Sequence, residues 1–219
     1  MEQRHENKFI FTKGDQINFK SLIINGYFRK LHENRIVNSI YYDNVDLDSL
    51  YQNINGSNYR VKHRVRWYNQ VSNSEVFFEK KIKSGLITKK QKISLGFFKN
   101  YFELSKYLHS NFFIKDIVNF TSENLIEVLT VSYQRAYFSD YKKKLRATYD
   151  TDIKTQKKNI KNKKNSFFNL DSEILELKYG LKDFEYVKNK IKQTEFNQRN
   201  QKFSKYVKSF LLLSEMGFH

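Results

Sequence analysis

The sequence predicts an α+β fold in which a large antiparallel sheet or barrel carries helices on its outer side. Three observations lead to this prediction. Apolar and polar residues alternate with a period of two over eight segments, as half-buried strands require. Five further segments repeat their apolar residues with helical spacing. The 219 residues are 39% hydrophobic and 16% aromatic, which allows a sizeable core and excludes a disordered polycation.

The first half of the chain interleaves strands with helices. Alternation predicts strands at residues 8–11, 37–42, 57–68, 75–83 and 86–95. Helical spacing predicts helices at 16–32 and 46–53. Asp46 is a suitable N-cap for the second of these, because it precedes an apolar stripe. Ser84-Gly85 predicts a hairpin turn between two neighbouring strands.

The second half continues in the same way. The expected strands are 127–139, 144–155 and 174–179, and the expected helices are 97–110, 184–193 and 203–213. Residues 154–165 (KTQKKNIKNKKN) are basic and of low complexity. We expect them to form an exposed, mobile loop, with a polyanion-steering arm as the alternative. The chain is expected to form a single domain over residues 1–219.

Positive charge is the strongest compositional signal. The chain has 40 Lys and Arg against 23 Asp and Glu, a net charge of +17. A folded chain with this excess repels itself, and a polyanionic partner is the usual reason to retain it. The candidates are nucleic acid, an anionic membrane, and a nucleotide or polyphosphate. The absence of cysteine excludes disulfides and thiolate metal sites.

Several other classes of site have no support. The 7 glycines form no phosphate-cradling loop, so any bound phosphate must be held by side-chain cations. The 5 histidines form no metal-binding pair. No signal peptide is visible in Met1–Lys13, and the apolar run Phe210–Leu213 is too short to span a bilayer. We therefore expect a soluble, cytoplasmic protein.

The segment from Tyr59 to Tyr68 carries the clearest functional pattern. Alternate side chains of a strand share a face. This face would carry Arg60, Lys62, Arg64 and Arg66, about 6.6–6.8 Å apart. The alternative is a solvated face opposite the core, which is common for two charges but uncommon for four of one sign, given the like-charge penalty.

The same alternation aligns charged side chains in other strands. Glu6 and Lys8, Glu79 and Lys81, and Glu176 and Lys178 each form a Glu-x-Lys pair on one face. Lys90 and Lys92 share a face, Arg135 aligns with Tyr133, and Arg146 aligns with Thr148 and Asp150. One Glu-x-Lys pair occurs often by chance. Three such pairs, together with the strand from Tyr59 to Tyr68 and two further arginine strands, indicate a closed barrel with charged groups inside and helices covering its apolar outside.

Eight segments, in order along nearly the whole chain, resemble the VTC domain. This domain is the polyphosphate-polymerase branch of the CYTH or triphosphate tunnel metalloenzyme superfamily. The segments are RHENKF (4–9), SIYYDN (39–44), DLDSLYQNINGSNYRVKHRVRWY (46–68), FFEKKIKSG (77–85), TVSYQRAYF (130–138), LRATYDTDI (145–153), LELKYG (175–180) and KFSKYVKS (202–209).

The resemblance implies a closed antiparallel eight-stranded tunnel barrel. It also implies transfer of the γ-phosphate of ATP to a growing polyphosphate chain in the tunnel, with Mn²⁺ or Mg²⁺. The catalytic cations carried over are Arg64, Arg66, Lys81, Arg135, Arg146, Lys178 and Lys205. The substrate-binding set is Lys8, Arg60, Lys62, Lys90, Lys92, Tyr133 and Ser204, with parity favouring Lys90 or Lys92 over Lys89. The expected metal ligand is Glu176, with Glu6 and Glu79 as additional candidates.

Other functions remain open from the residues alone. A metal-dependent triphosphatase would use water as the nucleophile, with Glu6 or Glu79 as a general base. A non-catalytic module for polyphosphate or inositol phosphates would need the cations but no metal. Nucleic-acid binding is the generic interpretation of the charge, but no nucleic-acid-binding motif is visible. The expected ligands are ATP, polyphosphate and pyrophosphate, and no nucleic acid is expected as a partner. A membrane partner protein encoded elsewhere stays open.

Overall fold

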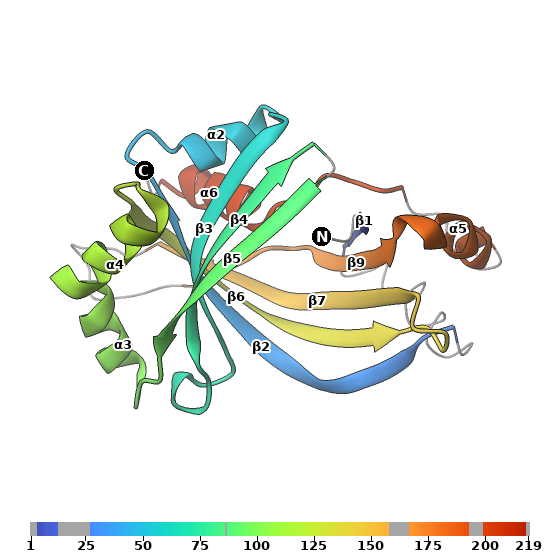
Figure 1. Ribbon diagram of the computed structural model, residues 1–219, viewed down its shortest axis with the longest axis horizontal. Helices are drawn as coiled ribbons and strands as arrows, with labels where there is room; N and C mark the ends of the chain where they lie inside the picture. The colour runs from blue at the N-terminus through green and yellow to red at the C-terminus, as the bar shows by residue number, and fades with distance from the viewer. Residues whose placement is uncertain (1–3, 13–26, 86, 158–166, 193–198, 218–219) are drawn as a thin grey trace. The chain divides into compact units, whose positions relative to one another are not determined.

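The computed structural model describes residues 4–12, 27–85, 87–157, 167–192 and 199–217 (Figure 1). Strands and α-helices within these residues define an α+β fold. The strands are β1 (Arg4–Phe11), β2 (Arg29–Asp43), β3 (Tyr59–Tyr68), β4 (Val76–Ser84), β5 (Ile87–Gly96), β6 (Ile126–Ser139), β7 (Leu145–Gln156), β8 (Phe168–Asn169) and β9 (Glu173–Gly180). The helices are α2 (Asp48–Ile54), α3 (Tyr101–Leu108), α4 (Asn111–Thr121), α5 (Phe184–Lys192) and α6 (Lys205–Glu215).

The strands are hydrogen-bonded in the order β1-β9-β7-β6-β2-β3-β4-β5, and the two-residue strand β8 pairs with β7. The pairs β1·β9, β7·β9, β2·β3, β3·β4 and β4·β5 are all antiparallel. The α+β class with an antiparallel sheet is therefore confirmed. The closed eight-stranded barrel is not confirmed, because β1 and β5 end the strand order and the described sheet is open.

The outer edge of β1 is occupied by an irregular segment. The backbone N–H of Lys8 donates to Asn200 Oδ1 at 2.9 Å, and the N–H of Gln201 donates to the Lys8 carbonyl at 2.8 Å. A strand edge presents unpaired backbone groups that require such partners. The segment around Asn200 supplies them at Lys8, in the place that a further strand would take.

Two predicted helices differ from the structure. Of the expected helix 16–32, residues 16–26 lie outside the described residues, and residues 29–32 begin strand β2. The predicted helix 97–110 is shorter in the structure, where α3 is followed by the unpredicted α4. Of the expected loop 154–165, residues 154–156 form the end of β7, and residues 158–165 lie outside the described residues.

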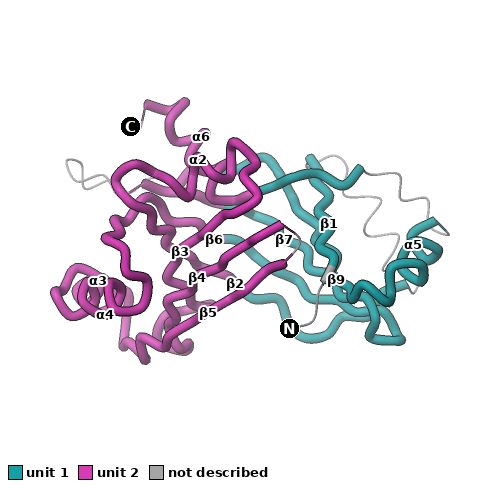
Figure 2. The backbone as a smooth tube through the Cα atoms, turned by 45° about the horizontal axis from the view of Figure 1, so that its top comes forward, with its two compact units in different colours: residues 1–35, 133–153, 169–203 teal, residues 36–132, 154–168, 204–219 magenta. Residues whose placement is uncertain are grey.

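The chain divides into two compact units (Figure 2). Unit 1 comprises residues 1–35, 133–153 and 169–203, and unit 2 comprises residues 36–132, 154–168 and 204–219. Unit 1 contains β1, β9 and α5, and unit 2 contains β3, β4, β5 and the other four described α-helices. The long strands β2, β6 and β7 each contribute residues to both units.

Alternating apolar residues build the core of unit 1. Phe9 and Phe11 on β1 are buried, as are Leu175 and Leu177 on β9. Phe9 lies directly opposite Leu175 in the β1·β9 register. Val187 of α5 joins the same cluster, so the helix covers the apolar face of these strands. The charged residues of β1 and β9 alternate with this core and therefore lie on the other face.

Unit 2 has its own core between β3–β4 and the α3–α4 pair. Val65 and Phe78 of the sheet are fully buried. Phe113 and Ile117 of α4, spaced one turn apart, pack against the same cluster. Ser110 caps α4, because its hydroxyl accepts the Phe113 N–H. Because α3 and α4 cover one face of the sheet, the cations of β3 are left on the opposite face.

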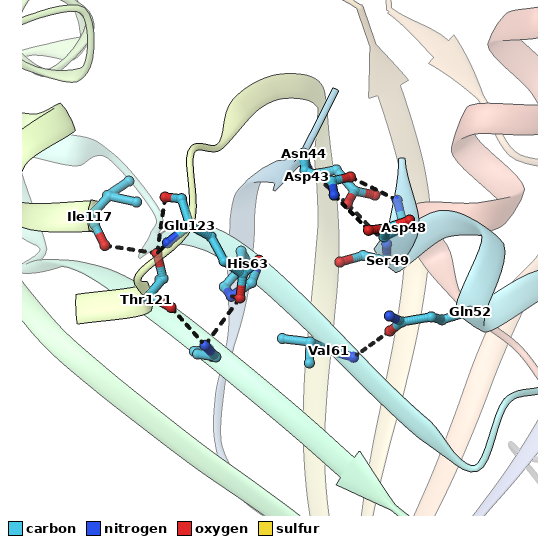
Figure 3. A network of polar contacts seen from close by, with 11 residues as sticks. Asp43, Asn44, Asp48, Ser49, Gln52, Val61, His63, Ile117, Thr121 and Glu123 are labelled. Atoms are coloured by element: carbon cyan, nitrogen blue, oxygen red, sulfur yellow. Dashed lines mark hydrogen bonds and ion pairs between the residues drawn. The ribbon is translucent and has the colours of Figure 1, made fainter. Parts of the chain in front are cut away.

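A buried carboxylate, rather than the predicted Asp46, organises the start of α2 (Figure 3). Asp43 Oδ1 accepts the Ser49 N–H and Oδ2 accepts the Leu50 N–H, each at 3.0 Å. Tyr206 of α6 donates its hydroxyl to Asp43 Oδ2 at 2.8 Å. Asp43 is therefore a structural group that joins α2 to α6, and the prediction of Asp46 as the cap was wrong.

The apolar face of β3 also holds a buried histidine (Figure 3). His63 Nε2 lies 3.9 Å from Glu123 Oε1, and the Lys80 ammonium lies 3.3 Å from the same carboxylate oxygen. Lys80 also donates to the Thr121 carbonyl at 3.4 Å, which ties the C-terminus of α4 to the sheet. Burial and then the charge of Lys80 lower the pKa of His63 to about 4, although Asp43 opposes the shift.

We expect His63 to make the folded state sensitive to mild acid. The imidazole titrates near 6.5 when unfolded but near 4 when folded, so the unfolded chain takes up the proton first as the pH falls. Its contribution to stability is present above about pH 6.5 and is lost as the pH falls towards 4, about 3 kcal/mol over that window. Urea unfolding of the wild type and His63→Phe at several pH values measures it.

Phenylalanine suits this comparison because His63 stacks on Phe78, with ring centroids 6.0 Å apart. The variant should lose less stability than the wild type between pH 6.5 and 4.5. Equal losses in the two proteins over this range would show that His63 is not the responsible group.

No helix in the described part of the chain is both long enough and apolar enough to cross a membrane.

Candidate functional site

Strands β3, β4 and β5 of unit 2 present one highly charged face, called here the cationic face. Four of its cations come from β3, two from β4 and two from β5, and one carboxylate lies among them. Its members are Arg60, Lys62, Arg64, Arg66, Glu79, Lys81, Lys83, Lys90 and Lys92. The strand register therefore assembles the predicted β3 cations with those of the next two strands.

The register brings like charges directly opposite one another. Lys62 faces Lys81 across β3·β4, and Lys81 faces Lys90 across β4·β5. Directly opposed like charges destabilise a sheet unless an anion compensates for them. Lys89 faces Ile82 instead and lies on the apolar side. The structure thus places both Lys90 and Lys92 on the cationic face.

Glu79 is the centre of a tight ion-pair cluster on this face. Its side chain is only 4% exposed. Arg64, its direct partner on β3, donates Nε to Glu79 Oε2 at 2.7 Å and places Nη2 2.6 Å from the same oxygen. Arg66 Nη1 lies 3.8 Å from Oε2, and Lys90 Nζ contacts Oε1. One carboxylate therefore gathers three predicted phosphate-binding cations.

The charges of this cluster determine its protonation state. Burial alone would raise the pKa of Glu79, but Arg64, Arg66 and Lys90 outweigh burial and lower it to about 2. Burial lowers the pKa of Lys90, against the opposing attraction of Glu79. Glu79 is therefore ionised near neutral pH, and the cluster retains an excess of positive charge.

Two further contacts position cations of β3. The Nε of Arg66 donates to Ser39 Oγ on β2 at 3.3 Å. The Lys62 ammonium donates to Ser204 Oγ at 2.8 Å, and the same hydroxyl caps α6 by accepting the Val207 N–H at 3.4 Å. Lys205 is the first residue of α6. Of the two residues predicted to contact phosphate here, Ser204 thus contacts Lys62, and Lys205 follows it in the chain.

We expect polyanions to stabilise the protein in proportion to their charge, because they relieve repulsion on the cationic face. At a free ligand concentration of about 100 Kd, binding contributes about 2.7 kcal/mol. For a chain of this length, that corresponds to an increase in Tm of about 5–10 °C. A thermal-shift series should rank triphosphate and pyrophosphate above sulfate. Equal shifts for all three anions would contradict a built phosphate site.

Unit 1 holds a second charged cluster, the Glu176 cluster, formed by Glu6 and Lys8 of β1 and by Glu176 and Lys178 of β9. Lys8 faces Glu176 in the register, and Glu6 faces Lys178. The Lys8 ammonium lies 3.2 Å from Glu6 Oε1 and 3.8 Å from Glu176 Oε2, and it donates to the Phe203 carbonyl at 3.1 Å. Lys178 Nζ contacts Glu176 Oε1. Both carboxylates therefore share the ammonium of Lys8.

Arg135 in the same unit is held by a carboxylate that was not predicted. Its Nε donates to Asp150 Oδ1 at 2.6 Å and its Nη2 donates to Oδ2 at 2.7 Å. Asp150 is fully buried. The guanidinium also lies 5.2 Å from the centroid of the Tyr133 ring. Asp150 thus fixes the orientation of the Arg135 guanidinium before any ligand binds.

The Glu176 cluster has the chemistry to hold a hard divalent cation together with a phosphate ligand. Burial would raise the pKa of Glu176, but Lys178, Lys8 and Arg135 hold it well below its usual range, so the carboxylate is ionised. Mg²⁺ commonly takes one or two carboxylates and completes its shell with phosphate oxygens and water. Glu176 with Glu6 fits this mode. Within the described residues, no group of three His, Cys, Asp or Glu side chains forms a complete protein cage.

One predicted site residue is exposed, and two residues that hold site arginines were not predicted in that role. Arg146 is exposed and faces Lys178 across β7·β9. Asp150 and Ser39, which hold Arg135 and Arg66, were not predicted. Alternation had already placed Asp150 on the same strand face as Arg146, but it does not indicate the pairing with Arg135 on another strand. Ser39 could not be found without the β2·β3 register, which pairs it with Arg66.

Comparisons with known proteins give the family of the chain and structures with a similar fold. The family model described as the VTC domain matches residues 3–214. The PH1819 protein of Pyrococcus horikoshii OT3 has a similar structure, with a TM-score of 0.52 and 15% identity over 96% of this chain and 99% of that one. A protein of Bacillus halodurans described as a candidate adenylate cyclase gives a TM-score of 0.53 and 16% identity over 93% and 95% of the two chains.

A second candidate adenylate cyclase, from Vibrio parahaemolyticus, gives a TM-score of 0.53 and 10% identity over 95% of this chain and 98% of that one. At these identities the structures show a shared fold alone. A search of curated proteins gives no match. The family model covers nearly the whole chain, including both charged clusters, and the chain belongs to the VTC domain family.

Proposed function

We propose that this protein is an ATP-dependent polyphosphate polymerase that transfers the γ-phosphate of ATP to a growing polyphosphate chain. The observation that supports this best is the cationic face, where eight cations surround one buried carboxylate. Such an excess fits a ligand with several adjacent negative charges. Membership of the VTC domain family supports the same class of chemistry.

The reaction needs no nucleophilic side chain. A terminal phosphate oxygen of the polyphosphate chain attacks the γ-phosphorus, a new P–O–P bond forms, and the bond to the β–γ bridging oxygen breaks to release ADP. The protein's contribution to such a transfer is alignment and charge stabilisation. Arg64 and Arg66 offer planar donor forks for phosphate oxygens, and Lys90 supplies a point charge.

Glu79 prepares this cluster for its ligand. It engages Arg64 through Nε and Nη2, which fixes the plane of the guanidinium before any ligand arrives. Preorganised donors avoid the cost of reorientation when charge develops in the transition state. We therefore assign Glu79 as a positioning residue rather than a metal ligand.

In unit 1, Glu176 with Glu6 would hold Mn²⁺ or Mg²⁺, and Lys8, Lys178 and Arg135 would bind phosphate oxygens. A bound divalent cation would supply charge neutralisation on those oxygens. Lys8 and Lys178 already contact Glu176. These lysines would therefore exchange part of their contact with Glu176 for contact with phosphate when a metal–phosphate complex binds.

A product assay tests the proposal. The protein is incubated with ATP and Mn²⁺, and the products are separated by gel electrophoresis. Long polyphosphate together with ADP is the expected result. Free phosphate without polymer would indicate a triphosphatase instead of a polymerase. Binding of polyphosphate without any consumption of ATP would replace it with a non-catalytic binding module.

A further inference from the structure

Unit 1 contains a basic hollow beyond the Glu176 cluster. Its volume is about 700 Å³, within the range of small-molecule sites. The residues that line it are Lys143, Lys144, Arg146, Lys178, Tyr179, Gly180, Lys182 and Asp183. Five are cations and one is a carboxylate. Arg146 and Lys178 belong to the candidate site, whereas Lys143, Lys144 and Lys182 have no role assigned so far.

The backbone conformation of Lys143 is unusual. The turn between β6 and β7 is closed by the Asp140 N–H to the Leu145 carbonyl at 3.0 Å and by the Lys143 N–H to the Asp140 carbonyl at 3.1 Å. Within it, Lys143 has φ 57°. This left-handed conformation suits Gly or Asn and strains a lysine. A glycine at this position would keep the turn while removing the side chain.

The neighbouring Lys144 is held in place by its surroundings. Its ammonium lies 3.6 Å from Asp183 Oδ1 and 5.3 Å from the centroid of the Tyr186 ring. Tyr186 is itself fixed, because its hydroxyl donates to Asp140 Oδ2 at 2.7 Å. A cation that is positioned before binding loses less conformational freedom when an anion arrives.

The lining also restricts the class of ligand. Among the described residues that line the hollow, Tyr179 is the one aromatic residue, and the others are cationic, acidic or glycine. Tyr179 is 4% exposed and packs into the core of unit 1, so it offers little surface on which a nucleotide base could stack. Arg146 and Lys178 face each other across β7·β9, and the other lysines extend away from them along the turn and the residues after β9. Cations distributed in this way match an extended chain of phosphates.

We propose that this hollow binds a linear polyphosphate, contacting phosphates beyond those at the Glu176 cluster. The inference rests on the proposed function, because it extends the same polyphosphate site. It implies that affinity increases with chain length beyond triphosphate, and that this increase depends on Lys143, Lys144 and Lys182.

Binding by calorimetry without ATP or metal tests this inference. The variant combines Lys143→Gly, Lys144→Gln and Lys182→Gln, and the probes are triphosphate and a polyphosphate several times longer. We expect about a tenfold loss of affinity for the long chain, as three weakened charge contacts imply, with little change for triphosphate. The matched control removes three exposed lysines from unit 2, by Lys99→Gln, Lys106→Gln and Lys115→Gln.

The single variant Lys143→Gly separates binding from folding. It relieves the strained turn, so its Tm should equal or exceed that of the wild type while its affinity for long polyphosphate falls. Unchanged affinity for the long chain in the triple variant would overturn the inference. Equal losses for both probes, or the same loss in the unit 2 control, would also overturn it.

Inositol hexakisphosphate serves as a compact polyanion of comparable charge. If inositol hexakisphosphate binds more tightly than the long chain and loses affinity to the same degree in the variant, the proposal of a linear ligand is contradicted. The binding data are independent of turnover. If the variant loses affinity only for the long chain but the protein makes no polymer, this site is supported and the proposed function is rejected. If the protein makes polymer but the variant shows no such loss, the proposed function is supported and this site is rejected.

Discussion

Arg64→Ala and Arg66→Ala should each reduce the rate of phosphoryl transfer from ATP by about 10²–10³-fold, the usual effect of removing one preorganised donor. Both guanidiniums lie at the buried Glu79 carboxylate, with the Arg64 side chain 17% exposed and the Arg66 side chain 7% exposed. Single-turnover measurement at saturating ATP and Mn²⁺ isolates the chemical step. The folded state should persist in Arg64→Ala, because Glu79 retains Arg66 and Lys90 as partners, at a cost of about 1–3 kcal/mol.

Two controls refine this test. Arg64→Lys keeps the charge but loses the planar fork, so its rate should lie between those of the wild type and Arg64→Ala. Lys115→Ala removes an exposed cation of α4 on the opposite side of the sheet and should leave the rate unchanged. If Lys115→Ala lost the chemical step while Arg64→Ala kept it, the functional cations would lie on the helical surface instead of the cationic face.

Alternation was sufficient to predict most of the sheet. The strand from Tyr59 to Tyr68 has buried Val61, His63 and Val65 between its cations, and the predicted 57–68 differs from β3 by two residues. The start of β2 could not be found in the same way. Its residues from Arg29 to Ile36 are almost all exposed, so they carry no alternation for a pattern to detect.

Helix α4 was missed for a local reason. Its sequence from Asn111 to Thr121 contains many aromatic and β-branched residues, which have modest helix propensity. Ser110 was taken as the end of the preceding helix, whereas its hydroxyl caps α4.

Whether the sheet closes into a barrel depends on which strand edges meet. The contacts of Asn200 and Gln201 with Lys8 are formed between residues far apart in the chain, and no local pattern encodes them.

The alternation of side chains along each strand predicted which charges share a face, but it did not predict which charges form pairs. The rows of β3 and β4 cations follow from alternation, since alternate residues point to the same side. The pairing of Arg64 with Glu79 and of Arg135 with Asp150 depends on strand neighbours and register. These carboxylates orient the arginines, so the sequence predicted candidate phosphate-binding groups and the structure shows which carboxylates hold two of them.

Glu176→Gln should abolish turnover while leaving anion binding intact or tighter. The substitution keeps the shape of the side chain but removes the negative charge that Lys8 and Lys178 contact and that would hold a divalent cation. Glu176 is ionised near neutral pH, because its cationic neighbours keep its pKa well below the usual range despite burial. In the variant the neutral glutamine no longer offsets the positive charge of these cations. A phosphate ligand should therefore bind them at least as well without metal.

The measurement pairs turnover with pyrophosphate binding, each with and without Mn²⁺. In the wild type Mn²⁺ should strengthen pyrophosphate binding, and in Glu176→Gln this enhancement should disappear together with turnover. Glu185→Gln is the matched control in the same unit, because Glu185 is 70% exposed and forms a surface ion pair with Lys188 at 3.7 Å. If Glu176→Gln turns over ATP normally with Mn²⁺, then Glu176 is a structural partner of Lys8 and Lys178, and the metal is bound elsewhere.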